Sequence, residues 1–223
     1  MGISGLHNQV APWGRRRNLA DFAGQTLAVD AQGWLFRGCY SCARDLAMGV
    51  PTVGYVNFMF SRLDLLAHHG IRVVLVFDGR RSPMKESTSV LRRARQATEV
   101  AKGRETLRLA DVARGRGDRM QAEILEKQAA DHFGRGVKIS DDMVTTAIAA
   151  VRRRPGVRVL VAPYEADPQL AALVYGGAAS AIVTEDSDVC LTLSLSPGPG
   201  PKPCSSTPRS ALTRRPATST CRC

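Results

Sequence analysis

The chain has 223 residues and a formal net charge of +11, because 31 Lys and Arg stand against 20 Asp and Glu. Its hydrophobic fraction of 44% suffices for one core, and no apolar run reaches the roughly 18 residues of a membrane span. The basic excess favours a polyanionic partner such as nucleic acid or an anionic membrane surface, and the N-terminus lacks the pattern of a secretory signal.

Four short runs rich in Val, Leu and Ile predict strands buried on both faces of a parallel sheet. They are residues 26–30, 71–78, 157–162 and 180–184. Apolar residues at helical spacing lie between these runs and predict a helix that ends at Gly70 and another that Ser140 caps. This alternation predicts an α/β fold with a mostly parallel central sheet and flanking helices.

The six cysteines form no disulfide framework. Cys39 and Cys42 make a C-x-x-C within a predicted helix, and the other four lie in the last quarter of the chain. A zinc site would need a second closely spaced pair. We therefore interpret the cysteines as reduced thiols of an intracellular protein.

The last thirty residues differ in kind from the rest. From Ser194 onward the sequence holds six of the twelve prolines and no acidic residue. Such a segment cannot bury enough apolar surface to offset the entropy of ordering, so it predicts disorder. We expect one folded domain over residues 1–190, a disordered tail rich in Pro, Ser, Thr and Arg over 191–223, and no helix closing the domain.

Carboxylates follow every predicted strand. They are Asp30, Asp78, Glu165, Asp167, Glu185, Asp186 and Asp188. A single such residue is more often a cap or a turn residue, but parallel strands bring their carboxyl ends to one edge of an open sheet. So many like charges are tolerated there when cations bind them. We predict a site for two Mg²⁺ ions, which Mn²⁺ can replace, able to clamp a phosphodiester.

A basic segment begins directly after Asp78. Residues 80–119 carry 12 basic and 5 acidic side chains, a balance of +7. Within it, Lys85, Arg92 and Arg95 lie near one face of a predicted helix, where they can hold a phosphate backbone over the ions. A solvated helix face is the simpler interpretation of a charge run taken alone. An acidic pocket under a basic helix fits a phosphodiesterase better than a plain binding module.

The sequence also resembles the exonuclease 1 family, part of the flap endonuclease (XPG-type) superfamily of structure-specific 5′ nucleases. The segments that carry the resemblance cover roughly residues 1–190 and are MGISGL, VDAQGWLFRGCYSCA, VLVFDGRRSPMK, VLVAPYEADPQLA and TEDSD. The resemblance implies a nuclear, metal-dependent enzyme that removes nucleotides 5′→3′ from duplex DNA and cleaves 5′ flaps, in mismatch repair and end resection. Mismatch-repair proteins would be partners, but the C-terminal region that usually binds them is absent.

The resemblance further implies roles for individual residues. The metal ligands would be Asp30, Asp78, Glu165, Asp167, Asp186 and Asp188. Lys85 and Arg92 would act at the scissile phosphate, and the DNA contacts would be Gly2, Phe36, Arg93 and Arg95. The basic helical arch would span about residues 80–140, with GRGDR as a loop insertion. Phe36 stands where the family usually has His, and Pro168 stands where it usually has Ala.

After TEDSD the family continues with more sheet, a final Asp ligand and a helical motif that grips the uncut duplex. This sequence instead enters the proline-rich tail. Two hypotheses therefore stay open: a nuclease of this family, and a truncated, catalytically weak fragment that binds DNA and metal. A haloacid-dehalogenase-like phosphatase would need D-x-D-x-T at a strand end. A PIN-type ribonuclease would not explain the MGISGL start.

Overall fold

The computed structural model describes residues 5–80 and 86–195, which form two compact units. The first unit comprises Met1–Gly33, Arg62–Arg81 and Val151–Cys223, and the second comprises Trp34–Ser61 and Ser82–Ala150. Helices α2 (Ala31–Ser41) and α4 (Gly54–His68) each contribute residues to both units. Among the helices of the described ranges, none combines the length and apolar character that crossing a membrane requires.

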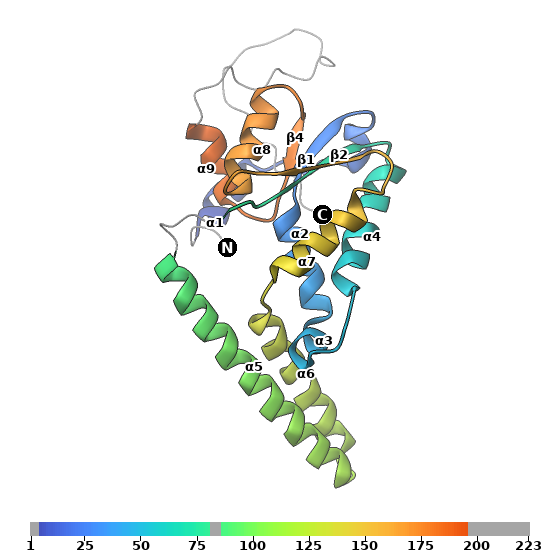
Figure 1. The fold of residues 1–223 in the computed structure, drawn as a ribbon, viewed down its shortest axis with the longest axis vertical. Helices are drawn as coiled ribbons and strands as arrows, with labels where there is room; N and C mark the ends of the chain where they lie inside the picture. The colour runs from blue at the N-terminus through green and yellow to red at the C-terminus, as the bar shows by residue number, and fades with distance from the viewer. Residues whose placement is uncertain (1–4, 81–85, 196–223) are drawn as a thin grey trace. The chain divides into compact units, whose positions relative to one another are not determined.

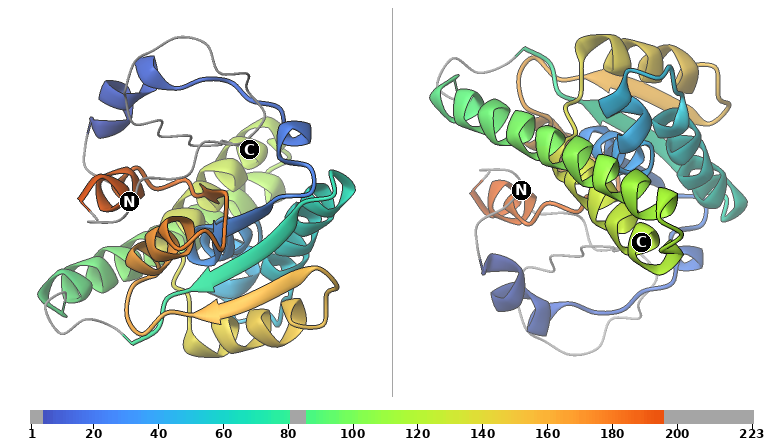
Figure 2. Two further views of the ribbon diagram at one scale, coloured as in Figure 1. Left: turned by 90° about the horizontal axis from the view of Figure 1, so that it is seen from above. Right: turned by 90° about the horizontal axis from the view of Figure 1, so that it is seen from below.

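The first unit is built on a four-stranded parallel sheet with the strand order β3-β2-β1-β4 (Figures 1 and 2). The strands are β1 (Thr26–Asp30), β2 (Arg72–Phe77), β3 (Val157–Val161) and β4 (Ala181–Val183). In the register, Asp30 pairs with Val76, Val29 with Val183, and Phe77 with Val161. All four strands therefore end at the same edge, and the predicted α/β fold with a parallel sheet is confirmed.

Both faces of the two central strands are buried. Helix α8 (Ala166–Tyr175) packs against β1, β2 and β4 on one face, and α9 (Asp188–Leu195) packs against α8 (Figure 2). The buried cluster on this face includes Ala28, Val74, Val76, Ile182, Leu170, Val174 and Val189. Leu27, Val29, Leu75 and Phe77, which alternate with the strand residues of that cluster, are also fully buried. Because both faces of these strands are buried, their sequences are nearly continuous apolar runs.

The prediction that residues 157–162 are buried on both faces is wrong for β3. This strand pairs only with β2 and lies at an edge of the sheet. Its residues are half-buried or exposed, and Val161 is 46% exposed. The apolar run identifies a strand, but it does not tell an edge position from a central one.

The expectation that no helix closes the domain is also wrong. Helix α9 begins at Asp188 and packs on α8, with Val189 buried and Leu193 against the same core cluster. The Tyr175 hydroxyl donates a hydrogen bond to the carbonyl oxygen of Leu193. The rest of the predicted tail, residues 196–223, lies outside the described residues.

The second unit is dominated by a helical hairpin. Helices α5 (Glu86–Gly115) and α6 (Arg119–Gly136) lie side by side (Figure 1). GRGDR forms the tight turn between them: Gly117 has φ +82° and Asp118 accepts the backbone N–H of Gln121 at 3.0 Å. The unit also holds α3 (Ala43–Met48) and most of α7 (Asp141–Val151).

Local signals in the sequence explain several helix ends. The Ser140 hydroxyl accepts the backbone N–H of Met143 at 3.3 Å, which confirms the predicted cap of α7. Gly70 has φ +67° after α4, a conformation that favours glycine. Pro168 is the third residue of α8, where a missing N–H costs no intrahelical bond. The N-terminal segment forms α1 (Leu6–Val10) and the short helices η1 (Ala11–Trp13) and η2 (Leu19–Phe22).

The three cysteines within the described ranges, Cys39, Cys42 and Cys190, are buried. Burial raises the pKa of the Cys39 thiol to about 12, and the neighbouring Cys42 thiol adds to the rise. A thiol with so high a pKa is a poor nucleophile at neutral pH. The C-x-x-C therefore packs as small apolar side chains in this structure.

Candidate functional site

Asp30, the last residue of β1, caps the helix that follows it. Its Oδ1 accepts the backbone N–H groups of Gln32 at 3.0 Å and of Gly33 at 3.1 Å. The residue is only 9% exposed. Burial raises the pKa of Asp30 above its ordinary value despite these hydrogen bonds, and the negative charge of Asp78 raises it further.

Glycine at position 33 makes this arrangement possible. A Cβ at that position would lie 2.9 Å from Oδ2 of Asp30, closer than Cβ contacts in proteins allow. The helix can therefore start directly beneath the carboxylate, and its first N–H groups hold one carboxylate oxygen.

Asp78 follows β2 and caps a different helix. Its Oδ1 accepts the backbone N–H of Ala166, the first residue of α8, at 2.8 Å. The N-cap residue of that helix, Glu165, makes no side-chain capping bond of its own. The carboxylate after β2 is thereby fixed next to the helix that carries Asp167.

Backbone hydrogen bonds join the loop after β2 to the loop after β3, next to Asp78 and the start of α8. The N–H of Gly79 donates to the carbonyl oxygen of Tyr164 at 2.6 Å, and that of Arg80 donates to Pro163 at 3.1 Å. The backbones approach so closely that a Cβ on Gly79 would lie 1.8 Å from the carbonyl oxygen of Ala162. Only glycine fits here without a shift of the backbone.

Asp167, in the first turn of α8, has a pKa that depends on charges from the whole acidic edge of the sheet. Its pKa is raised to about 6, first by burial and then by the negative charges of Asp30, Asp186, Asp78 and Glu165. These charges come from all four strand ends. Four of the other five candidate ligands thus lie close enough to Asp167, within one unit, for their charges to raise its pKa.

The donor set suits a hard divalent cation, because every contributor is a carboxylate. Positive charge would relieve the repulsion that raises the pKa of Asp167. Within the described ranges, however, no three His, Cys, Asp or Glu side chains already converge on one position that could hold a metal ion. Asp188 is the first residue of α9, and its side chain lies outside the described part. The role of these residues as metal ligands stays a prediction.

The candidate DNA-contacting residues lie in the second unit or outside the described residues. Arg92, Arg93 and Arg95 are exposed on α5, and Phe36 on α2 is 44% exposed. Gly2 and Lys85 fall outside the described ranges. Exposure leaves the four described side chains available to a ligand, and their roles stay predictions.

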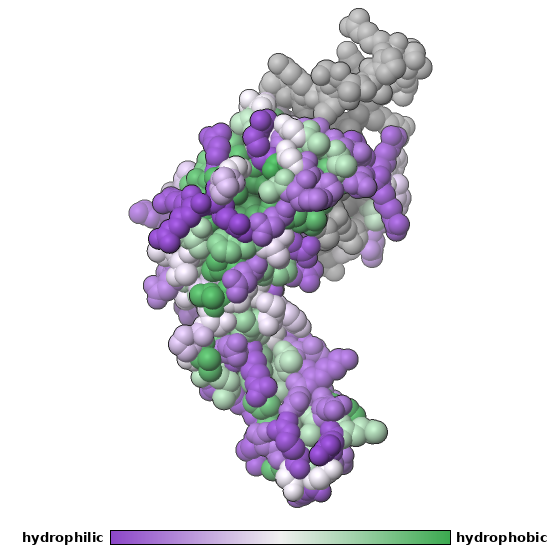
Figure 3. Space-filling view, turned by 90° about the vertical axis from the view of Figure 1, so that its right-hand side faces the viewer, coloured by the Kyte–Doolittle hydropathy of each residue, from purple (hydrophilic) through white to green (hydrophobic). Residues whose placement is uncertain are grey.

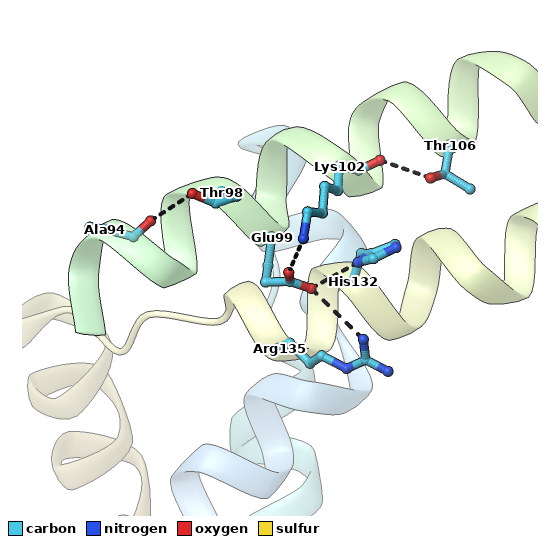
Figure 4. Close-up of polar contacts among 7 residues, drawn as sticks. All are labelled: Ala94, Thr98, Glu99, Lys102, Thr106, His132 and Arg135. Atoms are coloured by element: carbon cyan, nitrogen blue, oxygen red, sulfur yellow. Dashed lines mark hydrogen bonds and ion pairs between the residues drawn. The ribbon is translucent and has the colours of Figure 1, made fainter. Parts of the chain in front are cut away.

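The hairpin that carries these arginines is held by a polar cluster around Glu99 (Figure 4). Glu99 contacts Lys102 at 3.0 Å, Nδ1 of His132 at 2.8 Å and Arg135 at 3.9 Å. The hydrogen bond from His132, followed by that from Lys102, holds the pKa of Glu99 below its ordinary value. An imidazole and a guanidinium of α6 thus meet a carboxylate of α5.

Close packing supports the same hairpin. The Phe133 ring lies against Gly103, where a Cβ would come within 2.7 Å of it, and Gln96 donates to the carbonyl oxygen of Val137 at 2.6 Å. Polar side chains cover much of the visible hairpin surface (Figure 3). The arch predicted at about residues 80–140 is therefore a packed helical pair from residue 86 to 136.

Sequence reasoning missed two residues at the acidic edge. Gly79 belongs to the VFDGR segment, but its role depends on a loop from elsewhere in the chain. Thr184 opens the TEDSD segment, and its hydroxyl contacts Asp30, 154 residues away. In the sequence, two features could have indicated these roles. They are the glycine directly after the strand-end Asp78 and the threonine directly before the acidic run.

Two family models match the chain: the XPG N-terminal domain over residues 1–99 and the XPG I-region over residues 156–192. Exonuclease 1 of Danio rerio is 38% identical over 189 residues, 85% of this chain and 22% of that protein. Exodeoxyribonuclease 1 of Saccharomyces cerevisiae is 35% identical over 85% of this chain and 25% of that protein. The chain thus spans about a quarter of the length of these relatives.

Solved structures share the fold. The catalytic core of Rad2 in complex with a DNA substrate matches with a TM-score of 0.55 and 22% identity, over 85% of this chain and 46% of that one. Flap endonuclease-1 from Methanococcus jannaschii matches with a TM-score of 0.50 and 18% identity, over 82% of this chain and 56% of that one. These similarities show a shared fold, and the two family models show that the chain belongs to the XPG/Rad2 nuclease family.

Proposed function

We propose that this chain is an exonuclease 1-like 5′ nuclease, which removes nucleotides 5′→3′ from duplex DNA and cleaves 5′ flaps. The observation that carries the proposal is the acidic edge of the parallel sheet, where backbone N–H groups hold the strand-end carboxylates of Asp30 and Asp78. A family of nucleases and an oxygen-only donor set together favour hydrolysis of a phosphodiester assisted by two Mg²⁺ ions, with Mn²⁺ as a substitute.

The ions would be held by Asp30, Asp78, Glu165, Asp167, Asp186 and Asp188. When bound, they would supply an activated water and stabilise the charge that develops on the phosphate. The chain contributes preorganised ligands, because one oxygen of Asp30 and one of Asp78 are already fixed by backbone N–H groups. Their remaining oxygen atoms keep a defined direction.

The basic residues complete the proposal. Lys85 and Arg92 would stabilise the negative charge of the scissile phosphate. The other DNA contacts would come from Gly2, Phe36, Arg93 and Arg95. Exposed arginines bind phosphate oxygens without reading sequence, and the Phe36 ring can stack on a base. The substrate would be duplex DNA with 5′ ends or flaps.

The cellular role follows from the relatives named exonuclease 1. We propose a nuclear protein of mismatch repair and end resection, with mismatch-repair proteins as partners. Because the chain spans about a quarter of those relatives, this role and these partners are proposals for the whole protein rather than for the described residues.

A 5′-labelled flap and a recessed-end duplex, incubated with the purified chain in Mg²⁺ or Mn²⁺, test the proposal. We expect metal-dependent cleavage that is slow in Mg²⁺ and faster in Mn²⁺. The matched control is Asp78→Asn, whose amide oxygen can still accept the Ala166 N–H. DNA binding without cleavage in either metal would favour the second hypothesis, a binding fragment without turnover. Cleavage unchanged in Asp78→Asn would contradict the assigned site.

A further inference from the structure

Thr184, directly after strand β4, links two of the candidate ligands through a single hydroxyl group. Its Oγ1 donates to Oδ2 of Asp30 at 3.2 Å and accepts the backbone N–H of Asp186 at 3.0 Å. The residue is 7% exposed and, with Asp30, is one of the two buried polar residues of the described chain. The end of the fourth strand is thus tied to the end of the first by a side chain.

The two bonds require a hydroxyl group. A Thr hydroxyl has one proton to donate and lone pairs to accept with, and here both functions are used. A valine has the same shape but would leave an oxygen of a buried carboxylate and a backbone N–H without this partner. Serine would keep both bonds and lose only a methyl group.

The contact completes the positioning of Asp30. Oδ1 of this carboxylate is held by the N–H groups of Gln32 and Gly33, and Oδ2 is held by Thr184. The same hydroxyl fixes the backbone at Asp186 and therefore the start of the loop that leads to α9. Groups that orient metal ligands in this way commonly change metal affinity or activity by about 10- to 100-fold when they are removed.

We propose that Thr184 is a positioning residue of the acidic site, which sets the direction of the Asp30 carboxylate and the place of Asp186 so that both can bind one divalent cation. This proposal rests on the proposed function. It adds that the hydroxyl, and not the shape of the side chain, governs ion affinity. A residue that only completed the core would matter through its volume.

The test compares Thr184→Val with Thr184→Ser, using Mn²⁺ alone as the probe in the absence of DNA. Mn²⁺ binding is measured by electron paramagnetic resonance of the free ion, and the fold by circular dichroism and thermal unfolding. We expect Thr184→Val to weaken Mn²⁺ binding about 10- to 100-fold and Thr184→Ser to bind within a few-fold of the natural chain. Thr106→Val, which removes a hydroxyl from exposed α5, is the matched control and should leave binding unchanged.

A double-variant cycle ties the effect to Asp30. In an Asp30→Asn background, Thr184→Val should cause a smaller additional loss of Mn²⁺ affinity, because the carboxylate that Thr184 orients is already gone. If Thr184→Val does not fold, Thr184→Ala takes its place in both arms. Equal Mn²⁺ affinity of the natural chain and the folded hydroxyl-free variant overturns the positioning role alone. A natural chain that binds no Mn²⁺ overturns the proposed metal-dependent function as well.

Discussion

Asp78, directly after strand β2, accepts the backbone N–H of Ala166 at 2.8 Å and so caps helix α8, although 88 residues separate the two in sequence. The residue that occupies the cap position of that helix, Glu165, makes no side-chain capping bond. One carboxylate therefore stabilises the fold and carries charge at the candidate site. Substitutions at Asp78 can separate these two contributions.

Asp78→Ala should lower the free energy of unfolding by about 1 kcal/mol, the usual cost of losing a helix cap. Asp78→Asn should cost less, because its amide oxygen can accept the same N–H group. Both variants should lose cleavage, since neither supplies a carboxylate to a cation. Denaturant unfolding and the flap assay measure the two effects side by side. Equal stability of the two variants would show that the cap contributes nothing.

Arg92→Ala should lower turnover on a flap substrate far more than it lowers DNA affinity, by about 100-fold if the guanidinium acts on the transferring phosphate. Arg116→Ala, which removes an exposed arginine from the turn of the same hairpin, is the control and should spare turnover. Binding and single-turnover rates are measured on one substrate. Loss of affinity and turnover in equal proportion would mark Arg92 as an ordinary phosphate anchor.

The strands and the acidic edge could be predicted because each rests on local signals. A Val- and Leu-rich run that ends in a carboxylate identifies both a strand and a strand-end charge, as at Asp30 and Asp78. Parallel pairing then dictates that the charges share an edge. The Ser140 cap likewise depends only on residues within one turn.

The remaining features depend on contacts between distant parts of the chain. Residues 157–161 form an edge strand because only β2 pairs with them. Helix α9 is stabilised because Val189 and Leu193 pack against the core cluster that includes residues of α8. The Glu99–His132 contact joins residues 33 positions apart, and the Thr184–Asp30 contact joins residues 154 apart. No local pattern encodes such pairs.

In the metal-free chain, stability should rise as the pH falls from about 7 to about 5. The pKa of Asp167 is about 6 in the fold and ordinarily 3.8, so between these values the folded state binds a proton that the unfolded state does not. The pKa of Asp30 is raised too and acts in the same direction. Denaturant midpoints in EDTA across this pH range measure the effect.

Saturating Mn²⁺ should stabilise the chain at pH 7 and remove the gain on acidification, because the cation then takes the place of the proton. Asp167→Asn is the control and should show a smaller pH dependence without metal. If stability falls steadily from pH 7 to pH 5 in EDTA, repulsion among the carboxylates at the sheet edge does not destabilise the folded state.

Gly79→Ala should destabilise the fold by about 1–3 kcal/mol, the usual cost of forcing extra volume into a packed site. The added Cβ would meet the carbonyl oxygen of Ala162, a backbone atom that cannot rotate away, and the loop hydrogen bonds to Tyr164 and Pro163 would have to lengthen. Gly115→Ala is the matched control, because nothing lies within 4 Å of a Cβ there and alanine favours the helix.

Because the loop bonds of Gly79 and Arg80 also place Asp78 beside α8, Gly79→Ala should weaken Mn²⁺ binding as well as stability. Gly115→Ala should lower neither. Denaturant unfolding and Mn²⁺ titration of the two variants give the comparison. A Gly79→Ala chain as stable as the Gly115→Ala chain would mean that the loops can separate at little cost, and that their hydrogen bonds do not position Asp78.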